Sequence, residues 1–256
     1  MDILVCVKRV PATGGKITLT PDERGIDTRY ASFTVSPHEE CGVEEALRLV
    51  EKHGGTTTVL TLGPEVAADQ LRDAMAMGAQ RAVHLKTDGS EWDPGETARS
   101  IVEAISAQRA EGHNFDLLLL GNEAADTGDY QVGIRVAYGL GWPVVTGIKL
   151  LEIDQGVALC RREAAAGWEI FEIPLPAVIT VKEGINLPRY PTVPGRLKAK
   201  KAPIETVTPK PNGNTLQMVR LKLPPAKAQK REILGQGPEA APRLVEILLE
   251  LGVVAP

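Results

Sequence analysis

Short apolar, β-branched segments alternate with segments of helical periodicity along the first half of this chain. The apolar segments are candidate strands, and the segments between them place hydrophobic side chains three or four residues apart, as amphipathic helices do. Strands that alternate with helices form a parallel sheet covered by helices on both faces, so the pattern predicts a Rossmann-like doubly wound α/β fold. The candidate strands are 3–7, 57–62, 82–85 and 117–120, and the clearest candidate helices are 42–51 and 67–77.

The pattern changes after Pro143. Three strand-like segments are separated by the turn pairs Gln155-Gly156 and Ala166-Gly167, which predicts an antiparallel hairpin extension. A further apolar segment, 176–181, is expected to return to the core of the sheet. The three segments of the extension are 144–150, 157–163 and 168–173.

The last quarter of the chain is rich in Pro and Lys, and its periodicity is weak until an amphipathic helix expected at 238–251. This composition is typical of an arm that lies along another protein. We therefore expect an α/β domain over 1–190, followed over 191–256 by a loop and a C-terminal arm.

Composition excludes several classes of protein. The 256 residues carry a net charge of −4, and the only strong basic cluster, Lys198, Lys200 and Lys201, is too short to track a nucleic acid backbone. Three widely spaced cysteines favour neither a disulfide framework nor a zinc site, which fits a reducing cytoplasm. No run of about 18 apolar residues is present, so we expect no direct membrane insertion.

Ligands of open parallel sheets bind beyond the carboxyl ends of the strands. Four predicted loops occupy that edge, and the most promising is 121–133, where Gly121, Gly128 and Gly133 allow close approach of the backbone. Thr127 or Asp129 is expected to cap the helix that follows. From the residues alone, a phosphate-binding turn and an ordinary strand-to-helix loop remain equally open, because no G-x-G-x-x-G or P-loop motif occurs. The other three loops are 7–11, 63–64 and 88–90.

The segment 181–201 combines three closely spaced prolines with a basic end. Pro188, Pro191 and Pro194 stiffen the backbone, so an exposed loop can present Val193 to a partner at a small cost in ordering entropy. The residues alone leave a second interpretation open, a Pro-rich linker with solvated lysines.

Several segments resemble the electron-transfer flavoprotein beta-subunit family, in the same order along the chain. The loop 121–133 is similar to that family's "D-x-D-x-x-Q-x-G" turn, and 186–201 is similar to its signature "N-x-P-R-Y-P-x-x-P-x-x-x-K-A-K-K". The resemblance extends from residue 1 to about residue 205. The other matching segments are 7–13 ("VKRVPDT" in the family), 36–49 ("NPxxxxAVEEALRL"), 71–79 and 175–180.

The resemblance implies an AMP site of the adenine-nucleotide-binding type, in which the 121–132 loop wraps the phosphate. Two departures from the family alter this site, since Ser36 replaces the usual Asn and Tyr130 replaces a smaller or amide residue. The implied cofactor-binding residues are Cys6, Ser36, Pro37, His38, Glu39, Leu62, Gly63, Gly121, Asn122, Glu123, Ala124, Ala125, Asp126, Thr127, Gly128, Asp129, Tyr130, Gln131 and Val132.

Two further sets of residues follow from the resemblance. Arg162 and Glu163 match a pair that faces the partner's flavin, although on pattern alone they form a solvated strand face. The residues implied to dock on partner dehydrogenases are Tyr190, Thr192, Val193 and Pro194.

The implied function is that of an electron carrier without catalytic residues or metal of its own. Its FAD would lie mainly on an alpha subunit, and its partners would be flavin dehydrogenases of the acyl-CoA dehydrogenase type and a downstream quinone oxidoreductase. One alternative is a bifurcating complex whose beta subunit binds a second FAD and meets NADH. Another is a free-standing adenine-nucleotide sensor of the universal-stress type. An adenylyl-transferring enzyme would need an "SGGxDS" or "HxGH" motif, and neither occurs.

The four histidines are scattered and suggest no metal or catalytic cluster. His53 and His113 are expected to be exposed near helix ends, where a basic side chain interacts favourably with the helix dipole. Only His38 lies in an expected ligand loop.

Overall fold

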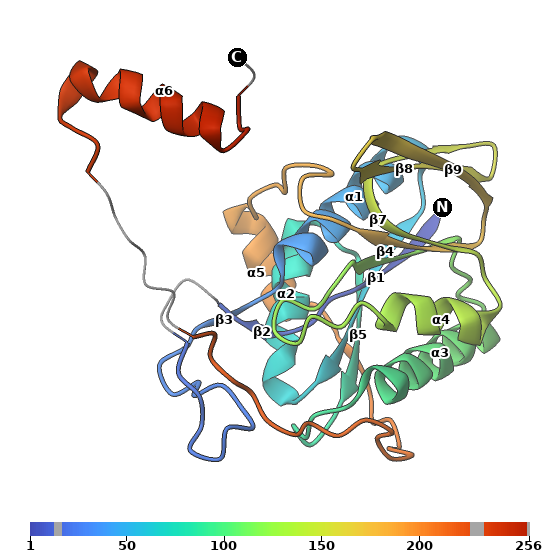
Figure 1. The fold of residues 1–256 in the computed structure, drawn as a ribbon. Coiled ribbons are helices and arrows are strands. Elements are labelled where there is room, and N and C mark those ends of the chain that lie inside the picture. Colours follow the sequence, from blue (N-terminus) through green and yellow to red (C-terminus); the bar gives the residue numbers. More distant parts are fainter. Residues whose placement is uncertain (13–16, 226–232, 255–256) are drawn as a thin grey trace. The chain divides into compact units, whose positions relative to one another are not determined.

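The structure is a computed structural model that describes residues 1–12, 17–225 and 233–254. Thr13, the last residue of the first matching segment, and parts of the expected C-terminal arm therefore lie outside the described residues. The chain forms two compact units, Met1–Arg220 and Leu221–Pro256, which are described separately (Figure 1). The division expected after residue 190 concerns contact with a partner and stays a prediction.

Among the described residues of the first unit, nine strands form one sheet in the order β11-β5-β4-β1-β6-β10-β7-β8-β9. Neighbours from β11 to β7 are parallel, which confirms the predicted α/β class. The parallel strands are β1 (Asp2–Cys6), β4 (Thr56–Gly63), β5 (Arg81–Lys86), β6 (Leu117–Gly121), β7 (Val144–Asp154), β10 (Ala177–Val181) and β11 (Glu205–Val207).

Helices cover both faces of this sheet (Figure 1). Successive side chains of a strand point to opposite faces, so Ile3 and Val5 of β1 belong to the core beneath α1 and α2, while Leu4 and Cys6 belong to the core beneath α3 and α4. The central strand β6 is buried on both faces, as its run of leucines predicts. The helices are α1 (Pro37–His53), the 3-10 helix η1 (Glu65–Ala67), α2 (Ala68–Met77), α3 (Pro94–Ala110), α4 (Val132–Leu140) and α5 (Val193–Lys201).

The predicted antiparallel extension is confirmed. Strands β8 (Val157–Ala164) and β9 (Gly167–Pro174) continue the sheet from β7 in an antiparallel sense. Gln155 and Gly156 both have positive φ angles, 46° and 80°, as a tight two-residue hairpin turn requires. A separate two-stranded sheet joins β2 (Val10–Pro11) to β3 (Phe33–Thr34).

The Pro-rich segment, expected as an exposed loop, differs in its second half, because residues 193–201 form helix α5. Thr192 caps the helix by accepting a 3.1 Å hydrogen bond from the N–H of Gly195. Pro194 falls in the first turn, where proline removes no intrahelical hydrogen bond. A Cβ on Gly195 would lie 2.6 Å from the carbonyl oxygen of Ala76, so glycine lets α5 approach α2.

In the second unit, η2 (Gly237–Ala240) leads into α6 (Ala241–Glu250), which confirms the predicted amphipathic helix. All residues of α6 are exposed or half-buried within the described part of the chain, including the apolar Leu244, Val245 and Leu249. Within the described residues, no helix combines the length and the apolar character that crossing a bilayer requires.

Candidate functional site

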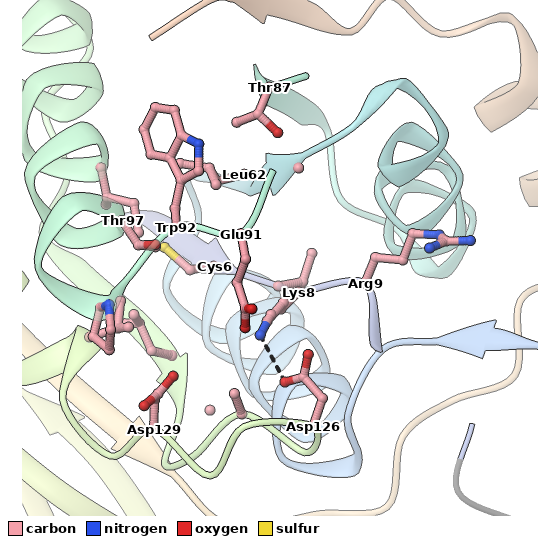
Figure 2. A pocket seen from close by; sticks show the side chains of 18 of the residues that line it. Cys6, Lys8, Arg9, Leu62, Thr87, Glu91, Trp92, Thr97, Asp126 and Asp129 are labelled. Atoms are coloured by element: carbon pink, nitrogen blue, oxygen red, sulfur yellow. Dashed lines mark hydrogen bonds and ion pairs between the residues drawn. The ribbon is translucent and has the colours of Figure 1, made fainter. Parts of the chain in front are cut away.

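A cavity of about 330 Å³ lies at the carboxyl edge of the parallel strands (Figure 2). Its walls come from the ends of β1, β4 and β6, from the loop between β5 and α3, and from the loop between β6 and α4. The four loops predicted to share this edge therefore do meet at one pocket. Of the predicted cofactor-binding residues, those that line it are Cys6, Glu39, Leu62, Gly63, Gly121, Glu123, Ala124, Asp126, Asp129 and Val132.

Of the remaining predicted residues, Ser36 and Asn122 are buried next to residues that line the pocket. Ser36 is buried and caps α1, its Oγ accepting a hydrogen bond from the N–H of Glu39 at 3.4 Å, and Pro37 is the first residue of the helix. Asn122 is also buried, and its side-chain oxygen accepts a 2.9 Å hydrogen bond from the hydroxyl of Thr180 on β10. Ser36 can cap the helix in place of the family's Asn because both residue types favour that position.

His38 connects α1 to the segment that follows β10. Its Nδ1 accepts a 2.7 Å hydrogen bond from the N–H of Glu183, and its Nε2 lies 3.1 Å from the carboxylate of Glu123. An Nδ1 that accepts carries no proton, so the proton is on Nε2 and is donated to Glu123. This geometry describes a neutral histidine that orders two loops. His53 and His113 are exposed, as predicted, and His84 is buried, with its Nε2 3.1 Å from the carbonyl oxygen of Gly63.

Glu39 is a buried carboxyl group at the floor of the pocket. Its Oε2 accepts a 2.9 Å hydrogen bond from the N–H of Lys8, and a Cβ on Gly121 would lie 2.8 Å from its Cγ. Burial raises the pKa of Glu39 to about 8, although hydrogen bonds from the backbone of Lys8 and Ser36 act in the opposite direction. Near neutral pH the floor of the pocket is therefore mostly uncharged.

The loop between β6 and α4 is held by its own hydrogen bonds. Asp126 accepts from the side chain of Lys8 and from the N–H of Thr127, both at 2.8 Å, and Figure 2 shows the Lys8–Asp126 pair. Gly128, with φ 67°, donates its N–H to the carbonyl oxygen of Ala124 at 2.8 Å. The hydroxyl of Thr127 donates to Asp129 at 2.7 Å. Lys8 is thereby fixed as a cation at the rim of the cavity.

The predicted cap of α4 by Thr127 or Asp129 is wrong, because these two side chains bond to each other. The N-cap is Gln131, whose side chain instead accepts from Arg135, and among the described side chains none caps this helix. The first N–H groups of α4 therefore remain available as donors beside the pocket, where the helix dipole favours an anion. Ala125 belongs to the same loop, and Tyr130 is 55% exposed.

The residues predicted to face a flavin lie on β8, away from the pocket. Arg162 donates to Glu169 at 2.7 Å and stacks over Phe171, while Glu163 accepts from Lys149 at 2.8 Å. The hydrogen bond from Lys149 lowers the pKa of Glu163, so this carboxylate stays ionised.

The residues predicted to dock on partners are exposed. Tyr190 is 94% exposed and Val193 is 73% exposed, and Leu187 and Leu197 present further apolar surface on either side. Thr192 has a structural role as the N-cap of α5, and the adjacent Pro194 is exposed.

Sequence reasoning missed the part of the wall that comes from α3 and the residues just before it. Trp92 precedes α3, and Pro94, Thr97 and Ile101 belong to the helix; all line the cavity. The predicted loop at 88–90 could have pointed to these lining residues, because the chain continues from it along the same edge of the sheet. The described residues bring together no group of three or more His, Cys, Asp or Glu side chains able to hold a metal ion. The three cysteines are free and buried, and burial raises the pKa of Cys6 and of Cys160 to about 12.

The family model for the electron transfer flavoprotein domain matches residues 25–212, which include most of the strands and all helices of the first unit. The chain belongs to the electron transfer flavoprotein beta-subunit family. The electron transfer flavoprotein subunit beta of Bacillus subtilis is 34% identical to this chain, over 97% of the length of each.

Two other members of the beta-subunit family have similar sequence identity to this chain. The subunit beta of Syntrophomonas wolfei is 36% identical over 96% of this chain and 95% of its own length. The mitochondrial subunit beta of Oryza sativa subsp. japonica is 39% identical over 82% of each chain. The expected family resemblance is thus confirmed over nearly the whole chain.

Proposed function

We propose that this chain is the beta subunit of a heterodimeric electron-transfer flavoprotein that binds AMP as a structural group. One observation carries the nucleotide assignment: the lining of the cavity is divided between polar groups, among them Lys8 and the start of α4, which no described side chain caps, and apolar side chains such as Leu62 and Ile101. A nucleotide has the same division, with an anionic phosphate and a flat base. Backbone N–H groups at a helix N-terminus are a common phosphate site.

The size of the cavity supports a mononucleotide. Its volume of about 330 Å³ lies at the lower end of the range of about 300–1,000 Å³ found for small-molecule sites. FAD would add a second phosphate, a ribityl chain and an isoalloxazine to the same adenosine unit. We therefore favour AMP over the second FAD of a bifurcating complex.

The electron carrier in this proposal is the FAD held mainly by the alpha subunit, which supplies the redox chemistry when bound. The hairpin bearing Arg162 and Glu163 would cover that flavin. Its two ion pairs keep a positive and a negative side chain ordered at the surface. The exposed apolar side of α6 would lie against the alpha subunit, because an unpartnered apolar surface of this kind marks an interaction site.

The exposed apolar residues around the start of α5 would receive the partner dehydrogenases, of the acyl-CoA dehydrogenase type. Electrons would then pass to a downstream quinone oxidoreductase. We place the complex in the cytoplasm, where the three cysteines would stay reduced.

The test is to co-express the chain with its alpha subunit, denature the purified complex and quantify the released AMP and FAD. One AMP and one FAD for each heterodimer is the expected result. Two FAD and no AMP would overturn the structural role of the pocket and favour bifurcation, and neither nucleotide would overturn the proposal. A compact, stable monomer of the chain alone in gel filtration would favour a free-standing sensor instead.

A further inference from the structure

Trp92 forms a flat, apolar part of the pocket wall. Its side chain is half-buried and lines the cavity at the edge of the sheet. Leu62 and Thr97 line the same cavity, and in the view of Figure 2 the indole lies apart from the Lys8–Asp126 pair. The wall near Trp92 thus offers aromatic and aliphatic surface, while charge comes from Glu91, the preceding residue in the chain, and from the Lys8–Asp126 pair.

The backbone on both sides of Trp92 is held by one distant residue. The side-chain oxygen of Asn214 accepts a 3.0 Å hydrogen bond from the N–H of Asp93, and its amide nitrogen donates at 2.9 Å to the carbonyl oxygen of Glu91. The two bonds bracket Trp92 in the chain. A side chain whose neighbouring peptides are both fixed loses little conformational freedom when a ligand binds.

Asp93 also binds the segment around Asn214 to the start of α3. Its carboxylate caps α3 by accepting from the N–H of Glu96 at 2.7 Å, and it also accepts from the N–H of Leu216 and the hydroxyl of Thr215, both at 2.9 Å. The segment around Asn214 is therefore anchored to the start of α3 by charge-assisted hydrogen bonds, which are stronger than neutral ones. This anchoring keeps Asn214 in place to hold the Trp92 backbone.

We propose that Trp92 stacks on the purine base of the bound adenosine phosphate, and that Asn214 is the positioning residue that holds Trp92 against the cavity. This inference rests on the nucleotide binding proposed above and adds to it the residue that recognises the base. Every base has a π-face that an aromatic side chain can cover. The phosphate would then lie toward Lys8 and the N-terminus of α4, which would stabilise its charge.

The experiment measures recognition of the base separately from recognition of the phosphate. The purified complex with the alpha subunit is equilibrated with labelled AMP, which is displaced by unlabelled AMP or by ribose 5-phosphate. The ratio of the two affinities reports the contribution of the base. The variants are Trp92→Leu, Trp92→Phe and Asn214→Ala, and the control is Tyr30→Leu, which removes a 96% exposed aromatic ring outside the pocket.

Trp92→Leu is expected to lower AMP affinity about 5- to 150-fold, the range for loss of one base–aromatic stack, and to leave ribose 5-phosphate affinity unchanged. Trp92→Phe is expected to lower AMP affinity less, since it keeps a smaller ring. Asn214→Ala should lower the same ratio, and in the Trp92→Leu background it should have no additional effect, because the two residues act through one contact. The control should match the wild type.

An unchanged ratio in both Trp92 variants, with AMP still bound, would overturn the stacking assignment and leave the proposed function standing. Equal losses of AMP and ribose 5-phosphate affinity would also overturn it, because they would indicate a structural defect. If the wild-type complex neither binds labelled AMP nor releases an adenosine nucleotide, both the inference and the proposed function fail.

Discussion

The Nε of Arg189 donates a 2.8 Å hydrogen bond to the carboxylate of Glu44, a side chain that is only 4% exposed. Arg189 also donates its backbone N–H to Glu44 and pairs with Glu51, about two turns farther along α1. Burial acts to raise the pKa of Glu44, but the hydrogen bonds from Arg189 and Arg48 lower it below its ordinary value. These bonds from Arg189 hold the segment that precedes α5 against α1.

We expect Arg189→Gln to lower the free energy of unfolding by roughly 1.5–3 kcal/mol, because it leaves a buried carboxylate with fewer charged donors. Denaturant unfolding of the purified complex measures the change. Lys198→Gln, on the exposed side of α5, is the control and should have little effect. An unfolding midpoint equal to that of the wild type would show that the pair does not fasten this segment.

Glu39 is expected to make stability depend on pH. Its folded pKa of about 8 is higher than the ordinary value of 4.5, so the folded state favours the protonated carboxyl. The neutral carboxyl contributes stability on the order of a few kcal/mol. This contribution is fully present below about pH 4.5 and is lost as pH rises through about 8. Glu39→Gln keeps an oxygen for the N–H of Lys8 and cannot ionise.

Urea unfolding of the wild type and of Glu39→Gln between pH 5 and pH 9 tests this prediction. The difference in stability should grow in favour of the variant as pH rises. Glu111→Gln changes an exposed carboxyl beyond α3 and serves as the control. Parallel pH profiles for the wild type and Glu39→Gln would contradict the raised pKa.

Gly133 brings the start of α4 against β10. A Cβ at this position would lie 2.6 Å from Cγ2 of Thr180, so Gly133→Ala is expected to push the helix away and to cost about 1–3 kcal/mol of stability. Because the displaced N–H groups face the pocket, the AMP content of the purified complex should fall as well.

Gly139→Ala is the matched control for Gly133→Ala. It introduces a similar clash, 2.8 Å from Cγ2 of Val102, but at the other end of α4. It should lower stability and leave the AMP content unchanged. Equal AMP content in both variants would show that the start of α4 does not bind the phosphate.

Val193→Ala is expected to weaken electron acceptance from a partner dehydrogenase and to leave the nucleotide content unchanged. The side chain is 73% exposed at the first position of α5, so its truncation removes apolar contact area without disturbing the core. Val→Ala removes two carbons, and at about 0.8 kcal/mol for each one buried by the partner, kcat/KM should fall roughly 4- to 15-fold.

The measurement for Val193→Ala is dehydrogenase-coupled reduction of the complex. Val219→Ala, another exposed valine, is the control. Loss of nucleotide from Val193→Ala, or an unchanged rate, would contradict the docking role.

The strands and helices near the pocket were predictable because their signals are local. The leucine run of β6 and the apolar periodicity of α1 and α2 require burial whatever lies around them, and parallel strands bring their carboxyl ends to one edge. The meeting of the four loops follows from that rule alone. The short edge strand β11, which is exposed along its length, has no comparable signal.

The sequence by itself therefore determined the family, the α/β class and the edge of the sheet where a ligand would bind. Only the tertiary structure decided which distant side chains support that edge and what ionisation state they favour. Asn214 reaches Asp93 across 121 positions of the chain, and Glu39 acquires its raised pKa from burial beneath Lys8 and Gly121. Such contacts form only when distant segments meet, and the free energy of a buried polar group depends on its surroundings. Local periodicity therefore predicts neither the contact nor the raised pKa.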